Sequence, residues 1–165
     1  MDRPLSFEDE LAGLLPRLRR FAHALSRNPS DADDLTQMTI ERALRSRAQW
    51  QQGTRLDSWA YKIMRNLWID TARSRSRKER FEAPAEEAES LGDDSAGAIE
   101  ASVDLNRVMA AMQRLPEEQR EVVALILIEG FGYREASEML GLPIGTVSSR
   151  LVRGRTALLA MVGEQ

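Results

Sequence analysis

Two stretches of this sequence combine residue types that bind nucleic acid. The first, WAYKIMRNLWIDTARSRSRK at positions 59–78, interleaves aromatic rings with positive charges. Bases stack on such rings while cations follow the phosphate backbone, so the pattern is typical of single-strand binding. The second, GTVSSRLVRGR at positions 145–155, holds hydroxyls and arginines without an acid. Short hydroxyls can approach phosphates or base edges, and arginines can pair bidentately with guanine.

Residue types needed for catalysis or metal binding are scarce. The chain has no cysteine and a single histidine, His23. Disulfides, thiolate metal sites and cysteine nucleophiles are therefore excluded, and histidine-rich metal sites and histidine-assisted triads are disfavoured. No nucleophile–base set, phosphate loop or metal motif is visible in the sequence. We expect a binding protein with no catalytic site, no cofactor and no metal.

The net charge of −3 hides an uneven distribution of charge. Residues 1–78 carry 15 Lys and Arg against 10 Asp and Glu, residues 79–104 carry one against nine, and residues 105–165 carry seven of each. A polyanion responds to this distribution rather than to the net charge. The basic first half is therefore compatible with a nucleic-acid partner.

Helical periodicity divides the first half into three segments. Apolar residues recur at helical spacing from Leu11 to Leu25, a second helix is expected from a cap at Ser30 or Asp31 to about Leu44, and a third over about 56–77. In the third helix, one face carries Trp59, Ala60, Ile63 and Leu67, and the other carries Tyr61, Arg65 and Trp68, with Lys62 at the flank. Outward rings favour base stacking; the alternative is that Tyr61 or Trp68 packs on a neighbouring helix.

The second half contains the pattern of a helix-turn-helix. A helix at 103–115 and another from Pro116 to about Gly130 precede a helix at 133–140, a break at 141–143 and a last helix at about 144–161. The required small residue, turn glycine and branched apolar residue are Ser137, Gly141 and Val147. The buried side is expected to hold Met139, Leu140, Leu142, Ile144 and Leu151. The alternative is an ordinary helical hairpin with a solvated basic face.

These segments predict an all-α fold of two small helical domains. Alternating strand patterns and hairpin turns are absent. The acidic stretch is rich in Ala, Glu, Ser and Gly, which is typical of a flexible, self-repelling linker. We expect domains at 1–78 and 104–165, joined by this linker at 79–103. The N-terminus resembles no secretion signal and no long apolar run occurs, so we expect a soluble, cytoplasmic protein without membrane insertion.

Taken together and in order, three stretches resemble bacterial sigma factors of the sigma-70 family, in the small two-domain extracytoplasmic-function (ECF) group. The stretches are DADDLTQMTIERAL, SWAYKIMRNLWIDTARSR and LPEEQREVVALILIEGFGYREASEMLGLPIGTVSSRLVRGRTAL. With the first helix, the resemblance spans about residues 11–78 and 104–160. It implies a factor that binds core RNA polymerase and directs transcription initiation at promoters with −10 and −35 elements.

The resemblance also implies roles for individual positions. Docking on the clamp helices of the polymerase β′ subunit would use Asp34, Leu35, Gln37 and Ile40. Recognition and melting of the −10 element, with a flipped base near Asn66, would use Tyr61, Lys62, Arg65, Asn66, Trp68, Arg73, Arg75 and Arg77, with Lys78 at the end of the basic run. Reading of the −35 element would use Thr146, Ser148, Ser149, Arg150, Arg153 and Arg155.

Two positions depart from the family pattern. Ser148 stands where the family usually has a basic residue, which removes one phosphate or guanine contact. Ser137 replaces a common alanine without a steric penalty.

Further partners follow from the same resemblance. It implies contact with the polymerase β flap, an acidic linker that mimics RNA in the polymerase channel, and an anti-sigma factor that holds the free, monomeric protein. LPRLRRFAHALS and YREASEML are similar to the alphaproteobacterial general-stress subgroup, in which a sigma-mimicking response regulator displaces the anti-sigma protein.

Two other classes of function compete with this interpretation. A helix-turn-helix repressor would need a dimerisation element, yet no long heptad seam is present, and it would leave the segment of rings and cations unexplained. A sigma mimic that binds only an anti-sigma protein is expected to lose the basic residues of its last helix and to carry a receiver domain. This chain keeps Arg150, Arg153 and Arg155 and has no room for a receiver.

Overall fold

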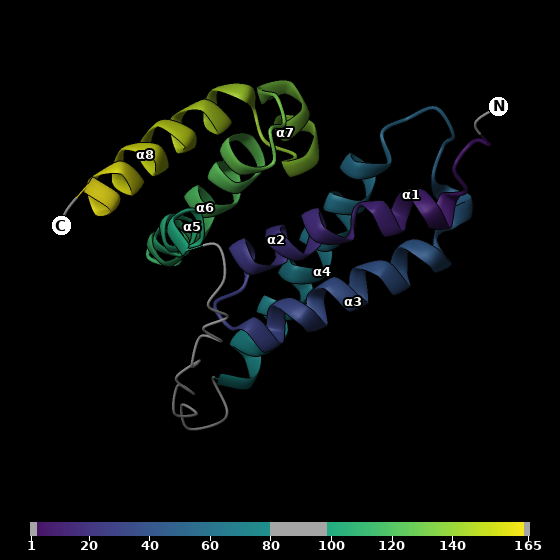
Figure 1. Ribbon diagram of the computed structural model, residues 1–165, viewed down its shortest axis with the longest axis horizontal. Helices are drawn as coiled ribbons and strands as arrows, with labels where there is room; N and C mark the ends of the chain where they lie inside the picture. The colour runs from purple at the N-terminus through teal and green to yellow at the C-terminus, as the bar shows by residue number, and fades with distance from the viewer. Residues whose placement is uncertain (1–2, 80–98, 164–165) are drawn as a thin grey trace. The chain divides into compact units, whose positions relative to one another are not determined.

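The computed structural model describes residues 3–79 and 99–163, with side chains described for 3–74 and 104–163. Every regular element in these ranges is a helix, which confirms the all-α prediction (Figure 1). The elements are α1 (Phe7–Gly13), α2 (Leu15–Leu25), α3 (Pro29–Arg45), the 3₁₀ turn η1 (Arg47–Gln49), α4 (Leu56–Glu79), α5 (Ile99–Met112), α6 (Glu117–Val123), the π-helical turn η2 (Ala124–Ile128), α7 (Tyr133–Leu140) and α8 (Ile144–Gly163). The chain divides into two compact units, Met1–Ser90 and Leu91–Gln165.

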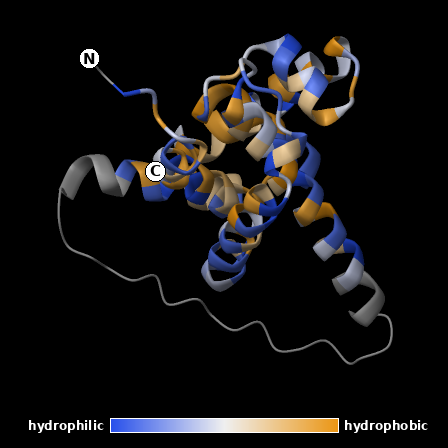
Figure 2. Cartoon of the chain, turned by 90° about the vertical axis from the view of Figure 1, so that its right-hand side faces the viewer, coloured by the Kyte–Doolittle hydropathy of each residue, from blue (hydrophilic) through white to orange (hydrophobic). Residues whose placement is uncertain are grey.

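The first unit is built around α3, which packs against both α2 and α4. Within each unit the apolar residues gather where helices face one another, and hydrophilic residues cover the remaining faces (Figure 2). An apolar cluster forms in the first unit where Phe7 and Leu11 of α1 meet Ala43 and Leu56. Trp50 and Trp59 pack on this cluster, with their rings 5.6 and 6.1 Å from that of Phe7.

The single helix expected over residues 11–25 is two helices. A capping box between Ser6 and Asp9 starts α1 earlier than expected, and Leu14 ends it. Pro16 lies in the first turn of α2, where its missing N–H costs nothing. The cap of α3 also differs from the expectation: Asn28, rather than Ser30 or Asp31, accepts a hydrogen bond, from the Ser30 N–H at 2.8 Å.

The second unit packs three helices against α8. Its helices begin and end near the expected residues, except that Pro116 caps α6 instead of lying inside its first turn. Gly154 allows α6 and α8 to cross closely, because a Cβ atom at this position would lie 2.7 Å from Val123 Cγ2. Among the helices of residues 3–79 and 99–163, none is long and apolar enough to cross a bilayer.

Candidate nucleic-acid and partner surfaces

Tyr61 does not face outward as the helical spacing predicted. Its side chain is fully buried, with its ring 4.9 Å from that of Phe21 and the guanidinium of Arg17 5.6 Å above it. Met64 is also fully buried, so the inner face of α4 runs through Ala60, Tyr61, Met64 and Leu67. The prediction of Tyr61 as a base-stacking ring is therefore wrong, and its alternative, packing on a neighbouring helix, holds.

Trp68 also lies against a neighbouring helix. It is half-buried and lines a small hollow together with Leu35 and Met38 of α3 and Thr71 of α4. The ring is thus arranged to pack along α3 rather than to stand free for stacking.

The polar face of α4 keeps four of the predicted residues accessible, one of them Arg73. Lys62 and Asn66 are exposed, and Arg65 is half-buried. Asn66 lines a hollow of about 200 Å³ whose floor is formed by Trp59, Ile63 and Leu67. Its polar rim is completed by Arg42, Ser46, Gln49 and Asp70. An apolar floor with amide, hydroxyl and charged groups at the rim suits a planar heterocycle such as an unstacked base.

Sequence reasoning missed part of this hollow. Ser46 and Gln49 come from the connection between α3 and α4, whose residues carry no periodic signal. Trp59 was expected only as a core residue, and the structure gives it both roles. Arg73 is exposed on α4, whereas the side chains of Arg75, Arg77 and Lys78 lie outside the described residues.

The residues of α3 that were expected to contact polymerase differ in how exposed they are. Asp34 and Gln37 are exposed, but Leu35 is 3% exposed and belongs to the core. Ile40 is half-buried and packs on the cluster around Phe7. Leu35 is therefore wrong as a direct contact, because its side chain is buried in the unit in which α3 packs against α2 and α4. Met38, 41% exposed, and Leu44, 46% exposed, are the large apolar side chains that α3 does present.

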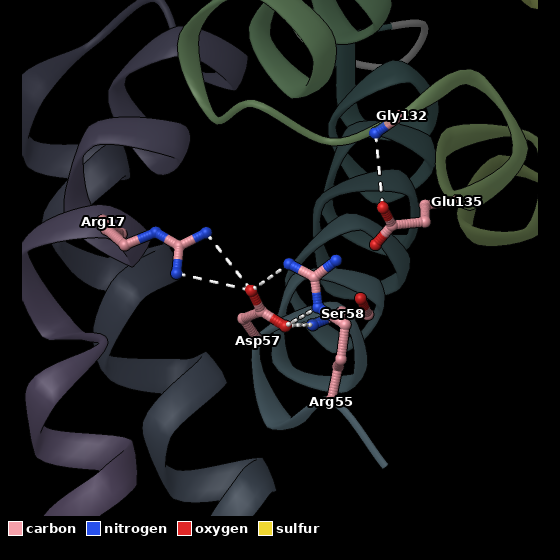
Figure 3. Close-up of polar contacts among 6 residues, drawn as sticks. All are labelled: Arg17, Arg55, Asp57, Ser58, Gly132 and Glu135. Atoms are coloured by element: carbon pink, nitrogen blue, oxygen red, sulfur yellow. Dashed lines mark hydrogen bonds and ion pairs between the residues drawn. The ribbon is translucent and has the colours of Figure 1, made fainter.

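The helix-turn-helix is present as predicted, and the turn is closed by Ser137. The Gly141 backbone has φ of 66°, a left-handed conformation that suits glycine. The Leu142 N–H donates to the Ser137 carbonyl at 3.1 Å, and the Ser137 hydroxyl donates to the Leu142 carbonyl at 2.5 Å. At the other end of α7, the Gly132 N–H donates to Glu135 Oε1 at 3.4 Å (Figure 3). The serine at 137 thus contributes a turn contact that alanine lacks.

The outward face of α8 collects three predicted residues. Val147, Leu151 and Gly154 are buried against the other helices of the unit. Thr146, Ser149 and Arg153 follow one another at spacings of three and four and share the opposite face. Ser149 and Arg153 are exposed, and the Ser149 hydroxyl donates to the Thr146 carbonyl at 3.2 Å.

The remaining predicted residues of α8 lie at its flanks. Arg150, half-buried, borders the buried face on the side of Arg153, whereas Ser148 and Arg155 lie on the other flank. Ile144 was expected in the core and is wrong there, because it is 48% exposed at the start of the helix. Tyr133 and Arg134, exposed in the first turn of α7, were not predicted and could contact a phosphate backbone.

The surroundings of Asp57 perturb the titration of its carboxyl group. Its side chain is 12% exposed and accepts hydrogen bonds from Arg55 Nη2 at 2.8 Å, from the Ser58 N–H at 2.8 Å and from Arg17 at 3.4 Å (Figure 3). Burial raises the pKa of this carboxyl, but the hydrogen bonds from Arg55 and Ser58 and the charges of Arg55 and Arg17 outweigh it and lower the pKa below its ordinary value of 3.8.

The described part of the chain holds no cluster of side chains suited to a metal ion. Within it, no three His, Cys, Asp or Glu side chains gather as a metal site would require. His23 lies 3.9 Å from Asp33, and both side chains are solvent-accessible.

Comparison with known proteins identifies both units. The model of sigma-70 region 2 matches residues 12–78, and the model of sigma-70, region 4 matches residues 105–158. The ECF RNA polymerase sigma factor EcfG of Rhodopseudomonas palustris is 36% identical over 157 residues, which cover 95% of this chain and 85% of the relative. The ECF RNA polymerase sigma factor SigE of Mycolicibacterium smegmatis is 39% identical over 145 residues, or 86% of this chain and 56% of the relative.

A solved structure is similar along nearly the whole chain. It is the sigma factor RpoE in complex with the anti-sigma factor NepR from Bartonella quintana, with a TM-score of 0.84 and 31% identity. The match covers 96% of this chain and 98% of that one. CnrH in complex with the cytosolic domain of CnrY is similar in fold alone, at a TM-score of 0.64 and 24% identity.

Proposed function

Because this chain belongs to the ECF group of the sigma-70 family and is a sigma factor, we propose a division of labour between its units. Residues 1–78 form a domain that docks on core RNA polymerase and opens the −10 element. Residues 104–165 form a domain that anchors at the −35 element. The acidic residues 79–103 join the two, so that promoter affinity exceeds that of either domain alone.

The observation that carries this proposal is the hollow beside Asn66. Melting a promoter requires an unstacked base to be held, at a cost of a few kcal/mol that the protein must offset. The apolar floor of Trp59, Ile63 and Leu67 can cover the faces of a base, and the Asn66 amide can hydrogen-bond to its edge. Lys62, Arg65 and Arg73 on the same helix supply charge for the adjacent phosphates.

The face of α8 formed by Thr146, Ser149 and Arg153 reads the −35 element from the major groove. Arg153 has the length and the donor geometry to pair with guanine, and Thr146, two turns earlier, contacts the backbone. Tyr133 and Arg134 in the first turn of α7 add contacts to the phosphates, as the first helix of such motifs does.

The exposed face of α3 docks on the polymerase β′ clamp helices. Asp34 and Gln37 provide polar contacts and Met38 an apolar one. The second contact with polymerase is made by residues 104–165, which bind the β flap. We place the protein in the cytoplasm, where its polymerase is.

An anti-sigma protein controls access to these surfaces. The support is the similarity to RpoE, whose structure was solved with its anti-sigma factor NepR, and to EcfG. This similarity also favours the general-stress subgroup, with a protein partner that exchanges for polymerase on the same surfaces.

Reconstitution with core polymerase tests the proposal. Transcripts from genomic promoter fragments should depend on this protein and disappear with Asp34→Lys, because the reversed charge lies in the docking surface. Asp104→Lys, an exposed acid in the second unit, is the matched control and should retain transcription. Binding of duplex DNA without binding of core polymerase would support a repressor instead, and binding of neither would support a sigma mimic.

A further inference from the structure

An ionic cluster outside the proposed DNA surfaces links three segments of the first unit. The carboxylate of Asp57, in the first turn of α4, accepts two hydrogen bonds from Arg55, one from Nε at 3.1 Å and one from Nη2 at 2.8 Å. Arg17 of α2 approaches the same carboxylate with Nη1 and Nη2, each at 3.4 Å (Figure 3). Such charge-assisted, bidentate contacts fix orientation as well as distance.

The cluster continues into the aromatic packing between α2 and α4. The guanidinium of Arg17 lies 5.6 Å above the Tyr61 ring, which packs 4.9 Å from Phe21. One arginine thus holds two successive turns of α4, through Asp57 and through Tyr61. The Asp57 side chain is 12% exposed, that of Arg17 is 33% exposed and the Tyr61 ring is buried, so these contacts restrain α4 more than fully exposed ion pairs do.

The segment held by Asp57 is the one that builds the hollow beside Asn66. Arg55 ends the connection that contributes Ser46 and Gln49 to the rim. Trp59, which forms part of the floor, is two residues beyond Asp57, and its N–H donates to the Arg55 carbonyl at 3.4 Å. The far end of the connection is held separately, by the ion pair of Arg47 with Glu8 and by the packing of Trp50 on Phe7.

We propose that Asp57 is a positioning residue for base recognition: by joining Arg55 to Arg17, it fixes the connection and the first turn of α4 in the arrangement that the hollow requires. Asp57 itself touches no DNA. This inference rests on the proposed function of the hollow. It predicts that loss of the Asp57 charge relaxes base selectivity while docking on polymerase through α3 persists.

The test uses holoenzyme assembled from core RNA polymerase and the full chain. Wild-type holoenzyme first selects promoters from a duplex library with randomised −10 positions, and the selected promoter is then varied one base at a time. Initiation from the selected promoter, relative to its single-base variants, measures selectivity. Asp57→Asn should lower this selectivity about tenfold, because small misplacements at a site have large effects on rate. Asp57→Glu should restore most of it.

Two further variants separate positioning from a loss of stability. Ala24→Gly loosens the same unit in a buried turn of α2 without touching the cluster, and it should keep full selectivity. Arg17→Lys keeps the positive charge but loses the planar guanidinium, whose two terminal nitrogens both approach Asp57. This variant should therefore relax selectivity in the same direction as Asp57→Asn. Should Asp57→Asn fail to fold, Arg17→Lys decides the question.

The outcomes distinguish this inference from the function on which it rests. If Asn66→Ala relaxes selectivity but Asp57→Asn and Arg17→Lys do not, the positioning role is wrong and the base site stands. Equal relaxation by Ala24→Gly would also overturn it. If Asn66→Ala leaves selectivity unchanged, the assignment of the hollow itself fails, and the inference with it.

Discussion

Arg150, Arg153 and Arg155 are the same residue type on one helix, yet their positions give them different roles. Arg153 extends from the face that carries Thr146 and Ser149. Arg150 borders the buried face, and Arg155 lies on the opposite flank. A base contact requires a side chain on the face that enters the groove, so the three should differ in how they affect sequence recognition.

Arg153→Ala should weaken initiation from a promoter with an intact −35 element by about 1–3 kcal/mol, if the guanidinium pairs with a base. On templates with a scrambled −35 element the same variant should lose little. Run-off transcription at several salt concentrations measures both. Arg155→Ala is the matched control and should show less discrimination between the two templates. Equal losses on both templates would identify Arg153 as a phosphate contact.

Asp57 makes the stability of the first unit depend on pH. Its pKa in the folded protein lies below the ordinary value of 3.8, so the folded state favours the ionised carboxyl. This stabilisation is complete above about pH 5, since the unfolded group has a pKa of about 3.9. It is lost as the pH falls through the lowered pKa. Asp57→Asn should therefore be destabilising at neutral pH and progressively less so in acid.

Urea unfolding followed by tryptophan fluorescence can measure this difference. All three tryptophans, Trp50, Trp59 and Trp68, belong to the first unit, so the signal reports on it alone. A difference between wild type and Asp57→Asn that stays constant from pH 7 to pH 3 would contradict the role of the carboxylate charge.

At the scale of elements, the close crossing of α6 and α8 depends on Gly154. A methyl group there would lie 2.7 Å from Val123 Cγ2 and 3.2 Å from Gln119 Cβ. Gly154→Ala gains up to about 1 kcal/mol of helix propensity, but overpacking costs about 1–3 kcal/mol, so we expect a net loss of stability. Gly145→Ala, with open space around its Cβ position, should show no loss. Thermal melting by circular dichroism tests this, and an unchanged melting curve for Gly154→Ala would contradict the crossing.

The sequence predicted the elements better than it predicted their faces. Helical spacing and turn residues place α3, α4, α7 and α8 within a few residues, because these signals are local. The predicted rotation of α4 about its axis was wrong. Tyr61 is amphipathic, so its spacing alone does not decide whether its ring is buried; the packing of the ring against Phe21 and Arg17 does. The break between α1 and α2 was missed for a related reason: apolar spacing continues across Leu14, and the break is made by caps.

The candidate site follows the same rule. The exposure of Asn66, Lys62 and the polar face of α8 could be predicted from helical spacing, whereas their roles at a promoter stay predictions from the family pattern. Leu35 and Ile144 were misplaced, since an apolar residue in an amphipathic helix does not by itself indicate core or contact surface. Ser46 and Gln49 come from an irregular connection, and only the folded chain brings them beside Asn66.

At the scale of the whole molecule, charge is distributed along the chain so that each part meets a different partner. Residues 1–78 have an excess of basic residues, which suits binding to DNA, a polyanion. Residues 79–104, in contrast, carry nine acids and one basic residue. We expect a negative segment between two DNA-binding units to repel duplex DNA and to lower the affinity of the free protein for sequences that offer no specific contacts. On this hypothesis, promoter selectivity depends in part on a segment that reads no base.

Neutralising that segment should release nonspecific DNA binding. Replacing Glu86, Glu87, Glu89, Asp93 and Asp94 by their amides changes the net charge from −3 to +2. The free variant should bind a scrambled duplex more tightly at 50 mM salt, measured by fluorescence anisotropy. The gain should shrink steeply towards about 200 mM salt, because phosphate contacts are salt-dependent. A gain that persists unchanged at high salt would indicate new specific contacts, and no gain at low salt would show that the acidic segment does not shield the DNA-binding units.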